Sequence, residues 1–239
     1  MPSIFTFCIY GDKPKYCEGL IRNLTQIAEL WPDFETWITV GADVPASYVT
    51  RYKEFPRTRI FQSPHTGPRL MAHRFFHIDN GAVDVMLVRD ADSRFGPRDI
   101  WCIRRFLEQP SYKVFTIRDH PNHVFSILGG QWGMRRIEGF SIRAAYRVFC
   151  AAGGPIDEYY ADQKFLHEHI YKAFRTVMIA YVSDNVIEGD SYEVIPLPNR
   201  DKWDYCGSVY EITGTTGEYP VYSLDGDVAT PSSHPSSGL

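Results

Sequence analysis

Segments typical of β-strands alternate with helical segments along most of the chain. The first pair is the apolar stretch 3–10 and the segment 14–31, whose apolar side chains recur on one helical face. We predict further strands at 36–40, 58–61, 83–88, 112–117 and 176–182, and helices at 70–78, from 97 onward, at 141–151 and at 157–174. Strands that alternate with helices form βαβ units with a parallel sheet. The pattern therefore predicts an α/β fold with a largely parallel central sheet flanked by helices.

The charge and cysteine content exclude several classes of protein. The chain has 239 residues, with 25 Lys and Arg against 29 Asp and Glu, which argues against a nucleic-acid partner. No apolar run reaches the roughly 18–20 residues that a membrane span needs, and the first ten residues resemble a strand rather than a signal peptide. Five scattered cysteines without a C-x-x-C pair indicate free thiols in a reducing compartment. We therefore expect a cytoplasmic protein without a membrane span.

The composition changes at the C-terminal end. Seven of the last nine residues are Pro, Ser or Gly, which cannot bury enough apolar surface to fold. We predict one folded domain at 1–222 and a Ser/Pro-rich linker or disordered tail at 223–239. Such a linker suggests that further C-terminal domains follow in a longer protein.

The sequence Asp90-Ala91-Asp92 directly follows the buried strand predicted at 83–88. Ligands of open α/β sheets bind at the carboxyl ends of strands. Two carboxylates there form a hard-oxygen site that suits Mg²⁺ or Mn²⁺, with substrate phosphates and waters as the other ligands. The alternative interpretation is a turn whose aspartates cap the following segment.

Several arginines flank this acidic pair. An Arg side chain matches phosphate oxygens well, and we favour Arg74 and Arg89 as phosphate contacts. The alternative is that each arginine pairs with a local carboxylate such as Asp79 or Asp99.

A second polar segment, with Arg118, Asp119 and His120, follows the strand predicted at 112–117. Nearby glycines, Gly130 among them, would let the backbone approach a ligand closely, and Trp132 offers a flat apolar face for a sugar ring. The alternatives are an ordinary loop with a packed tryptophan, or a metal site that uses His120.

Acidic residues also begin the helix predicted at 157–174. A carboxylate such as Asp162 at this helix start could take a proton from a hydroxyl nucleophile. The alternative is that these residues only cap the helix and interact with its dipole.

Taken together, these segments resemble a family of small glycosyltransferases with the GT-A fold. The family includes modules of chlorella-infecting large DNA viruses that build glycans on the major capsid protein. The resemblance covers about residues 1–215 and depends on the combination of motifs at 16–20, 89–94, 118–123, 129–133 and 162–163. It implies a Rossmann-type, mixed but mainly parallel sheet.

The resemblance also implies an activity and roles for individual residues. It suggests a nucleotide-sugar donor, expected to be a UDP-sugar with rhamnose as the sugar, and a glycan hydroxyl as acceptor. Mn²⁺ or Mg²⁺ would bind Asp90 and Asp92. In this family the end of the first strand holds the base and ribose, and the general base of inverting members lies at a helix start. The corresponding residues here are Ile9, Tyr10 and Gly11 for the nucleotide and Asp162 for the base.

Within the same resemblance, Arg118, Asp119 and His120 would position donor phosphates or sugar hydroxyls. A third metal ligand has no clear counterpart in this sequence. For a viral protein, the host cytoplasm is the expected location.

Two other functions fit parts of the pattern. A phosphatase of the haloacid-dehalogenase type also places Asp-x-Asp after a buried strand and would use Asp90 as its nucleophile. In that class the motif follows the first strand, whereas here it follows about the fourth. A non-catalytic sugar-binding module would use the same cleft without turnover.

Overall fold

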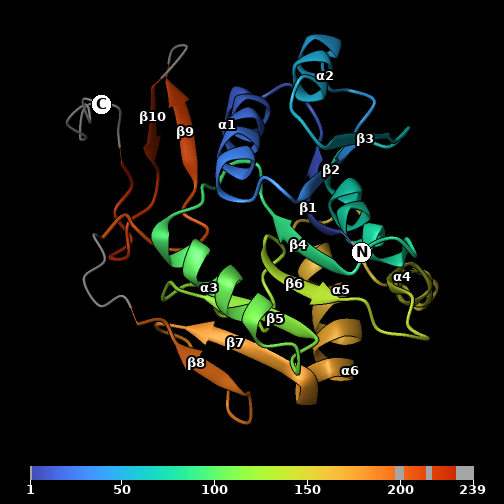
Figure 1. The fold of residues 1–239 in the computed structure, drawn as a ribbon, viewed down its shortest axis with the longest axis vertical. Helices are drawn as coiled ribbons and strands as arrows, with labels where there is room; N and C mark the ends of the chain where they lie inside the picture. Colours follow the sequence, from blue (N-terminus) through green and yellow to red (C-terminus); the bar gives the residue numbers. More distant parts are fainter. Residues whose placement is uncertain (1, 197–201, 214–216, 230–239) are drawn as a thin grey trace.

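The computed structural model describes residues 2–196, 202–213 and 217–229. Eight strands of these residues form one sheet in the order β3-β2-β1-β4-β6-β5-β7-β8 (Figure 1). They are β1 (Ser3–Ile9), β2 (Glu35–Val40), β3 (Thr58–Gln62), β4 (Val85–Arg89), β5 (Val114–Arg118), β6 (Gln131–Arg135), β7 (Met178–Val182) and β8 (Tyr192–Val194). Only β6 runs antiparallel to its neighbours, β4 and β5. The predicted mixed, mainly parallel sheet is confirmed.

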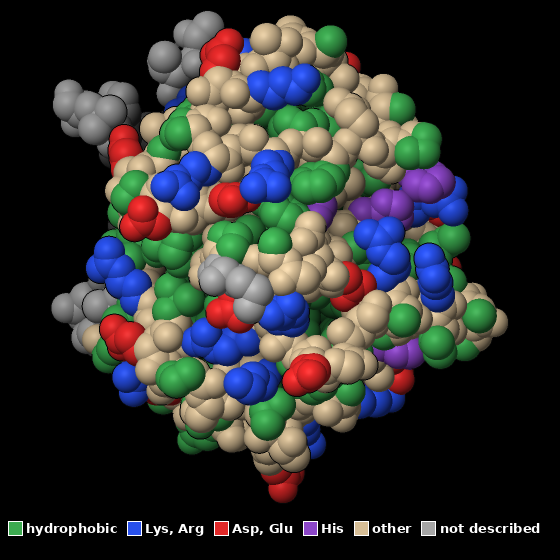
Figure 2. Space-filling view, turned by 45° about the vertical axis from the view of Figure 1, so that its right-hand side comes forward, with side chains coloured by type: hydrophobic (Ala, Val, Ile, Leu, Met, Phe, Trp, Pro, Cys, Tyr) green, Lys and Arg blue, Asp and Glu red, His purple; other side chains and the backbone are tan. Residues whose placement is uncertain are grey.

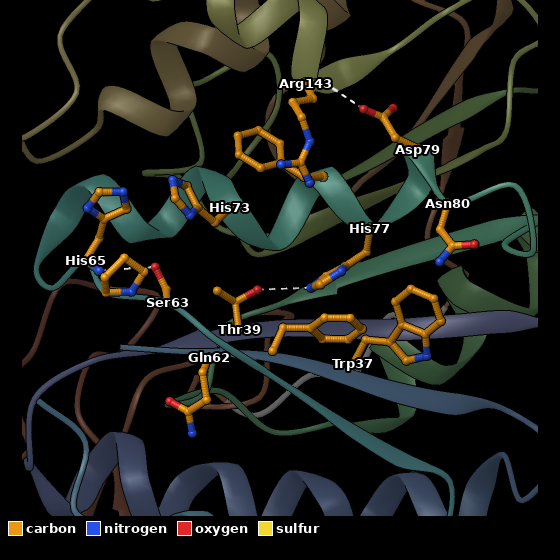
Figure 3. A pocket seen from close by; sticks show the side chains of 13 residues that line it. Trp37, Thr39, Gln62, Ser63, His65, His73, His77, Asp79, Asn80 and Arg143 are labelled. Atoms are coloured by element: carbon orange, nitrogen blue, oxygen red, sulfur yellow. Dashed lines mark hydrogen bonds between the residues drawn. The ribbon is translucent and has the colours of Figure 1, made fainter. Parts of the chain in front are cut away.

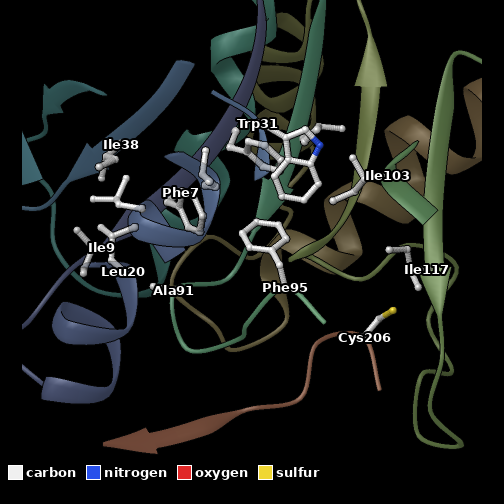
Figure 4. Close-up of a cluster of buried hydrophobic side chains, with 14 of the residues drawn as sticks. Phe7, Ile9, Leu20, Trp31, Ile38, Ala91, Phe95, Ile103, Ile117 and Cys206 are labelled. Atoms are coloured by element: carbon white, nitrogen blue, oxygen red, sulfur yellow. The ribbon is translucent and has the colours of Figure 1, made fainter. Parts of the chain in front are cut away.

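Helices cover both faces of this sheet. The helical segments are α1 (Pro14–Leu30), α2 (Ala46–Lys53), the 3₁₀ helix η1 (Pro68–Asp79), α3 (Pro97–Glu108), α4 (Ile142–Ala151), α5 (Ala161–Phe165), the π-helical η2 (Leu166–Tyr171), α6 (Lys172–Phe174) and the 3₁₀ turn η3 (Arg175–Val177). One buried cluster joins β1 to α1 and α3 and includes Phe7, Leu20 and Ile103 (Figure 4). A second cluster, with Met86 and Phe75, packs η1, α4 and η2 on the opposite face.

Most predicted elements lie where the hydrophobic pattern places them, and the differences have local causes. The segment 131–135 was expected to be a loop because three glycines precede or interrupt it, yet it forms β6. A Cβ atom on Gly133 would lie 2.6 Å from both the Met86 carbonyl oxygen and the Phe115 ring. This glycine therefore permits the close strand packing instead of marking a turn. The helix predicted at 157–174 begins only at Ala161 and contains the π-helical turn η2.

The C-terminal part of the chain folds back toward the end of β4. The strands β9 (Tyr210–Thr213) and β10 (Gly217–Pro220) form a hairpin that contacts α1. At the first residue of β9, the Tyr210 amide donates a 2.8 Å hydrogen bond to the Asp92 carbonyl. The first seven residues of the expected tail, 223–229, include the buried Ser223 and Ala229. The rest of that tail, 230–239, lies outside the described residues. None of the described helices is long and apolar enough to cross a membrane.

Candidate active site

A cavity of about 170 Å³ lies at the adjoining carboxyl ends of β1 and β4. Its walls come from β1 and its following residues, α1, η1, the acidic pair, the segment before α5 and the segment before β9. The lining side chains are Cys8, Ile9, Tyr10, Tyr16, Met71, Arg74, Asp90, Ala91, Asp92, Tyr159 and Val209. Gly11 follows Tyr10 with a φ of 71°, a conformation that favours glycine. The first strand and the acidic pair, far apart in the sequence, thus meet at one site.

The two carboxylates of the acidic pair lie close enough to repel each other, and Arg74 pairs directly with only one of them, Asp90. The Asp90 side chain is 42% exposed. Burial and the neighbouring Asp90 carboxylate raise the pKa of Asp92 to about 6. A raised carboxylate pKa means that the ionised form lacks stabilising partners. This is the electrostatic situation that a bound divalent cation would relieve.

Arg74 joins the acidic pair to Asp162. Its guanidinium is buried and donates to the Asp90 Oδ1 at 2.5 Å and to the Arg89 carbonyl at 3.0 Å. Its other terminal nitrogen lies 3.4 Å from the Asp162 Oδ2. A single buried cation therefore contacts carboxylates from two different parts of the chain.

Asp162 is the second residue of α5 and is almost fully buried. Burial raises the pKa of its carboxyl group, although the Arg74 guanidinium opposes that shift. Its Oδ1 accepts a 2.9 Å hydrogen bond from the Gln163 amide. A carboxylate with a raised pKa is better suited to accept a proton than an ordinary surface aspartate.

Two consecutive glycines bring backbone against these carboxylates. A Cβ atom on Gly129 would lie 2.4 Å from the Asp162 Oδ2, and one on Gly130 would lie 2.0 Å from the Asp90 Oδ2. Neither distance is possible for a real side chain, so any larger residue would displace the carboxylate. The glycines in this loop thus permit close contact with the acidic side chains of the site.

Other predicted site residues point away from the cavity. Arg89 pairs with Asp99 at 2.6 Å, and Arg118 pairs with Asp190 at the same distance. Asp119 is buried and paired with Arg98 at 2.6 Å.

His120 and Trp132 are also engaged inside the protein. His120 Nε2 lies 3.1 Å from the Ser223 carbonyl oxygen, and its ring packs on Tyr205. Trp132 is 1% exposed and meets Phe75 edge-on, so its ring faces are not open to a sugar.

Sequence reasoning missed two exposed tyrosines at the mouth of the cavity. Tyr159 is 72% exposed and Tyr160 is 46% exposed, and their ring centroids lie 4.2 Å apart. Tyr160 has a φ of 68°, an unfavourable value for a residue with a side chain. The signal in the sequence was the pair of adjacent tyrosines just before Asp162.

Asp90 and Asp92 fit a hard divalent cation. Carboxylate oxygens are the preferred protein ligands of Mg²⁺ and Mn²⁺, and Mg²⁺ usually takes one or two carboxylates and completes its shell with phosphates and waters. Within the described ranges, no group of three or more His, Cys, Asp or Glu side chains is placed to hold a metal ion. A cation here would therefore need ligands from the substrate.

Comparison with known proteins supports the fold. No protein-family model matches the sequence, and no curated protein matches it. Among solved structures, a 4-diphosphocytidyl-2C-methyl-D-erythritol synthase from Anaerococcus prevotii is 8% identical, with a TM-score of 0.51 over 76% of this chain and 87% of that chain. The mannosyltransferase PcManGT from Pyrobaculum calidifontis, in complex with GDP-Man and Mn²⁺, is 13% identical, with a TM-score of 0.51 over 82% of this chain and 57% of that chain.

A glycosyltransferase involved in the glycosylation of the major capsid of PBCV-1 is also among the similar structures. It is 13% identical, with a TM-score of 0.49 over 77% of this chain and 82% of that chain. The chain spans little more than half the length of the mannosyltransferase. At such low identities the two likenesses with a TM-score of 0.51 show the fold alone, and the chain has the GT-A-like fold predicted from its sequence.

Proposed function

We propose that this chain is a glycosyltransferase that moves a sugar from a nucleoside-diphosphate donor to a hydroxyl group of a glycan. The observation that carries the proposal is the buried Arg74, which lines the cavity at the strand ends and contacts both Asp90 of the acidic pair and Asp162. This arrangement supplies a cation-binding pair and a candidate base side by side. The mannosyltransferase complex, with its bound GDP-Man and Mn²⁺, offers a precedent for such a donor in a protein of this fold.

The donor would lie along the end of β1. Ile9 and Tyr10 line the cavity, and Gly11 leaves room for a base and ribose beside them. Asp90 and Asp92 would hold Mn²⁺ or Mg²⁺, which stabilises negative charge on a departing diphosphate when bound. We expect a UDP-sugar, with rhamnose as the sugar that the family resemblance implies.

Asp162 would act as the general base. Its carboxyl group is buried and pairs with Arg74, which lines the cavity and favours the ionised form that can accept a proton. Removal of the proton from an acceptor hydroxyl would let that oxygen attack the anomeric carbon from the face opposite the diphosphate. We therefore propose an inverting reaction.

The acceptor would approach over Tyr159 and Tyr160. Exposed aromatic rings suit the apolar face of a sugar, and this pair takes the role first considered for the buried Trp132. A glycan of a viral capsid glycoprotein is the acceptor that the resemblance implies. The five free cysteines support a reducing compartment, and we propose the cytoplasm of the host cell.

The phosphatase alternative is less well supported by the geometry. It needs Asp90 as a free nucleophile, but the Asp90 Oδ1 lies 2.5 Å from Arg74. The backbone of Gly130 also packs against the Asp90 carboxylate. Trapping of an aspartyl-phosphate on Asp90 would favour that alternative.

Calorimetry with nucleoside diphosphates tests the proposal. We expect UDP to bind more tightly with Mn²⁺ than without it, and Asp92→Ala to remove this metal dependence. Asp84→Ala, at an exposed aspartate beside the opposite end of β4, is the matched control and should bind like the wild type. Full metal-dependent binding by Asp92→Ala would refute the assignment of the acidic pair. No metal-dependent binding of any nucleotide would favour the non-catalytic module.

A second measurement separates the base from the donor site. Asp162→Asn should lower sugar transfer at least 100-fold and leave the affinity for UDP nearly unchanged, because general-base catalysis contributes about 10²–10⁴ in rate. Equal loss of transfer and of UDP binding would instead indicate a structural role for Asp162.

A further inference from the structure

A second and larger cavity lies on the other side of η1. It has a volume of about 530 Å³, is open to solvent and is lined by β2, β3, η1 and the start of α4 (Figure 3). The helix η1 separates the two cavities. Its residues Met71 and Arg74 line the candidate active site, whereas His73, Phe76 and His77 line the larger cavity.

The floor of this second cavity is aromatic. Phe61 is 36% exposed, and its ring lies 5.1 Å from Trp37 and 4.5 Å from His77. Trp37 is 2% exposed and its indole nitrogen donates to the Glu35 carboxylate at 2.7 Å, so it supports Phe61 from below and Phe61 presents the exposed ring. Such a floor favours a ligand with a flat apolar face.

The polar groups around this floor are almost uncharged. Burial lowers the pKa of His73 and of His77 to about 4, so both imidazoles are neutral at pH 7. Neutral imidazole offers one donor and one acceptor, and the Nε2 of His77 is already hydrogen-bonded to the Thr39 hydroxyl at 3.0 Å. Ser63 and Asn80 add a hydroxyl and an amide group to the same lining.

The two fully charged side chains among the described lining residues offset each other. The Asp79 carboxylate accepts hydrogen bonds from the Ile142 and Arg143 amides at 2.9 and 3.0 Å, at the start of α4. The Arg143 guanidinium lies 4.9 Å from the Phe76 ring. Figure 2 shows histidines beside Lys and Arg side chains on the right flank of the molecule. Among the described lining residues, a bound cation would find only the Asp79 carboxylate, which already accepts these hydrogen bonds. A diphosphate would find only the Arg143 guanidinium there as a positively charged partner.

We propose that this second cavity is a binding site for a neutral oligosaccharide. Sugar rings combine a flat apolar face with hydroxyl groups that both donate and accept, which matches the aromatic floor and the uncharged polar rim. The volume lies within the usual range of about 300–1,000 Å³ for ligand pockets. It is three times that of the candidate active site, 530 against 170 Å³, which leaves room for several sugar rings.

The position of the cavity suits the extended acceptor of a glycosyltransferase, and this use rests on the proposed function. β3 and β4 point the same way, because β3, β2, β1 and β4 pair in parallel. Ser63 and His65, which follow β3, therefore lie at the same edge of the sheet as Asp90 and Asp92. A glycan held in the larger cavity would reach the active site around η1.

Saturation-transfer NMR with defined sugars tests the proposal. The neutral probes are maltotriose, cellotriose, mannotriose, chitotriose and xylotriose, and the anionic probes are sialyllactose and inorganic phosphate. We expect at least one neutral trisaccharide to bind the wild type and to shift the indole N–H resonance of Trp37. UDP with Mg²⁺ should not displace it. Phe61→Ala and Arg143→Ala should each weaken binding at least fivefold.

Two controls make the outcome specific. Tyr192→Ala removes an aromatic ring that is 51% exposed on β8, at the far edge of the sheet, and should leave sugar binding unchanged. Asp92→Ala should also bind the trisaccharide as the wild type does, because Asp92 does not line the larger cavity. A failure of the proposed catalytic site can therefore be distinguished from a failure of the proposed oligosaccharide site. The proposal is overturned if no neutral trisaccharide binds at millimolar concentration, or if only the anionic probes bind. It is also overturned if folded Phe61→Ala and Arg143→Ala bind as the wild type does.

Discussion

At the scale of single residues, Arg74 has the most consequential position. It is buried and holds two carboxylates from distant segments, a task that requires the two terminal nitrogens of a guanidinium. We expect Arg74→Lys to lower the free energy of unfolding by about 2–4 kcal/mol, because a single ammonium group leaves one buried carboxylate unpaired. UDP binding should weaken as well. Arg69→Lys is the control, since Arg69 is 39% exposed and pairs with the exposed Asp157. Equal effects of both substitutions in urea unfolding would contradict this role.

His77 makes the stability of the fold sensitive to acid. Burial lowers its pKa from 6.5 to about 4, so the folded protein keeps His77 neutral while the unfolded chain takes up a proton. The contribution of the neutral His77 to the free energy of unfolding is therefore fully present above pH 6.5 and is lost as the pH falls toward 4. Between pH 7 and pH 5 this linkage destabilises the fold by about 2 kcal/mol. Between pH 7 and pH 5, we expect the free energy of unfolding to fall by about 2 kcal/mol less in His77→Gln than in the wild type. Urea unfolding at the two pH values measures this difference. The exposed His65→Gln should behave like the wild type.

At the scale of elements, the turn into β6 controls the orientation of the acidic pair. The Gly130→Ala substitution would place a Cβ atom 2.0 Å from the Asp90 Oδ2 and force that side chain to rotate. We expect a folded protein whose metal-dependent affinity for UDP is reduced at least tenfold. Gly81→Ala is the matched control, because the nearest atom to its new methyl group would lie 3.9 Å away. Normal UDP binding by Gly130→Ala in calorimetry would show that Asp90 tolerates the rotation.

The strand ends also explain which parts of the site could be predicted from the sequence. Apolar runs locate β1 and β4, and parallel pairing then places Tyr10 near Asp90. Arg89 and Arg118 were harder to assign, because side chains at neighbouring strand positions point to opposite faces. Both arginines end their strands pointing into the protein, where Asp99 of α3 and Asp190 before β8 meet them. The pairing of Arg89 with Asp99 is the alternative considered from the sequence, whereas the pairing of Arg118 with Asp190 depends on the packing of separate elements, which a local pattern does not contain.

At the scale of the whole molecule, the C-terminal segment closes the site from the side opposite η1. Val209 lines the candidate active site and forms an isolated bridge with Ser93. The composition of the tail predicted a Ser/Pro-rich linker or disordered segment over 223–239. It contained no sign that residues 223–229 pack against a distant loop, because the contact between His120 and Ser223 joins positions 103 residues apart.

Because residues 223–229 pack against the domain, chains truncated before and after this segment should differ in stability. A chain that ends at residue 222 lacks the Ser223 carbonyl that lies 3.1 Å from His120 Nε2, and the 2.7 Å hydrogen bond from the Leu224 amide to Lys202. Loss of these two contacts, the first of them buried, should cost roughly 2 kcal/mol and lower the melting temperature by about 5 °C. A chain that ends at residue 229 retains both contacts and should melt like the full chain. Since Val209 belongs to the same C-terminal segment, the shorter chain should also bind UDP more weakly. Identical melting curves and UDP affinities for the two truncated chains would mean that residues 223–229 do not support the site.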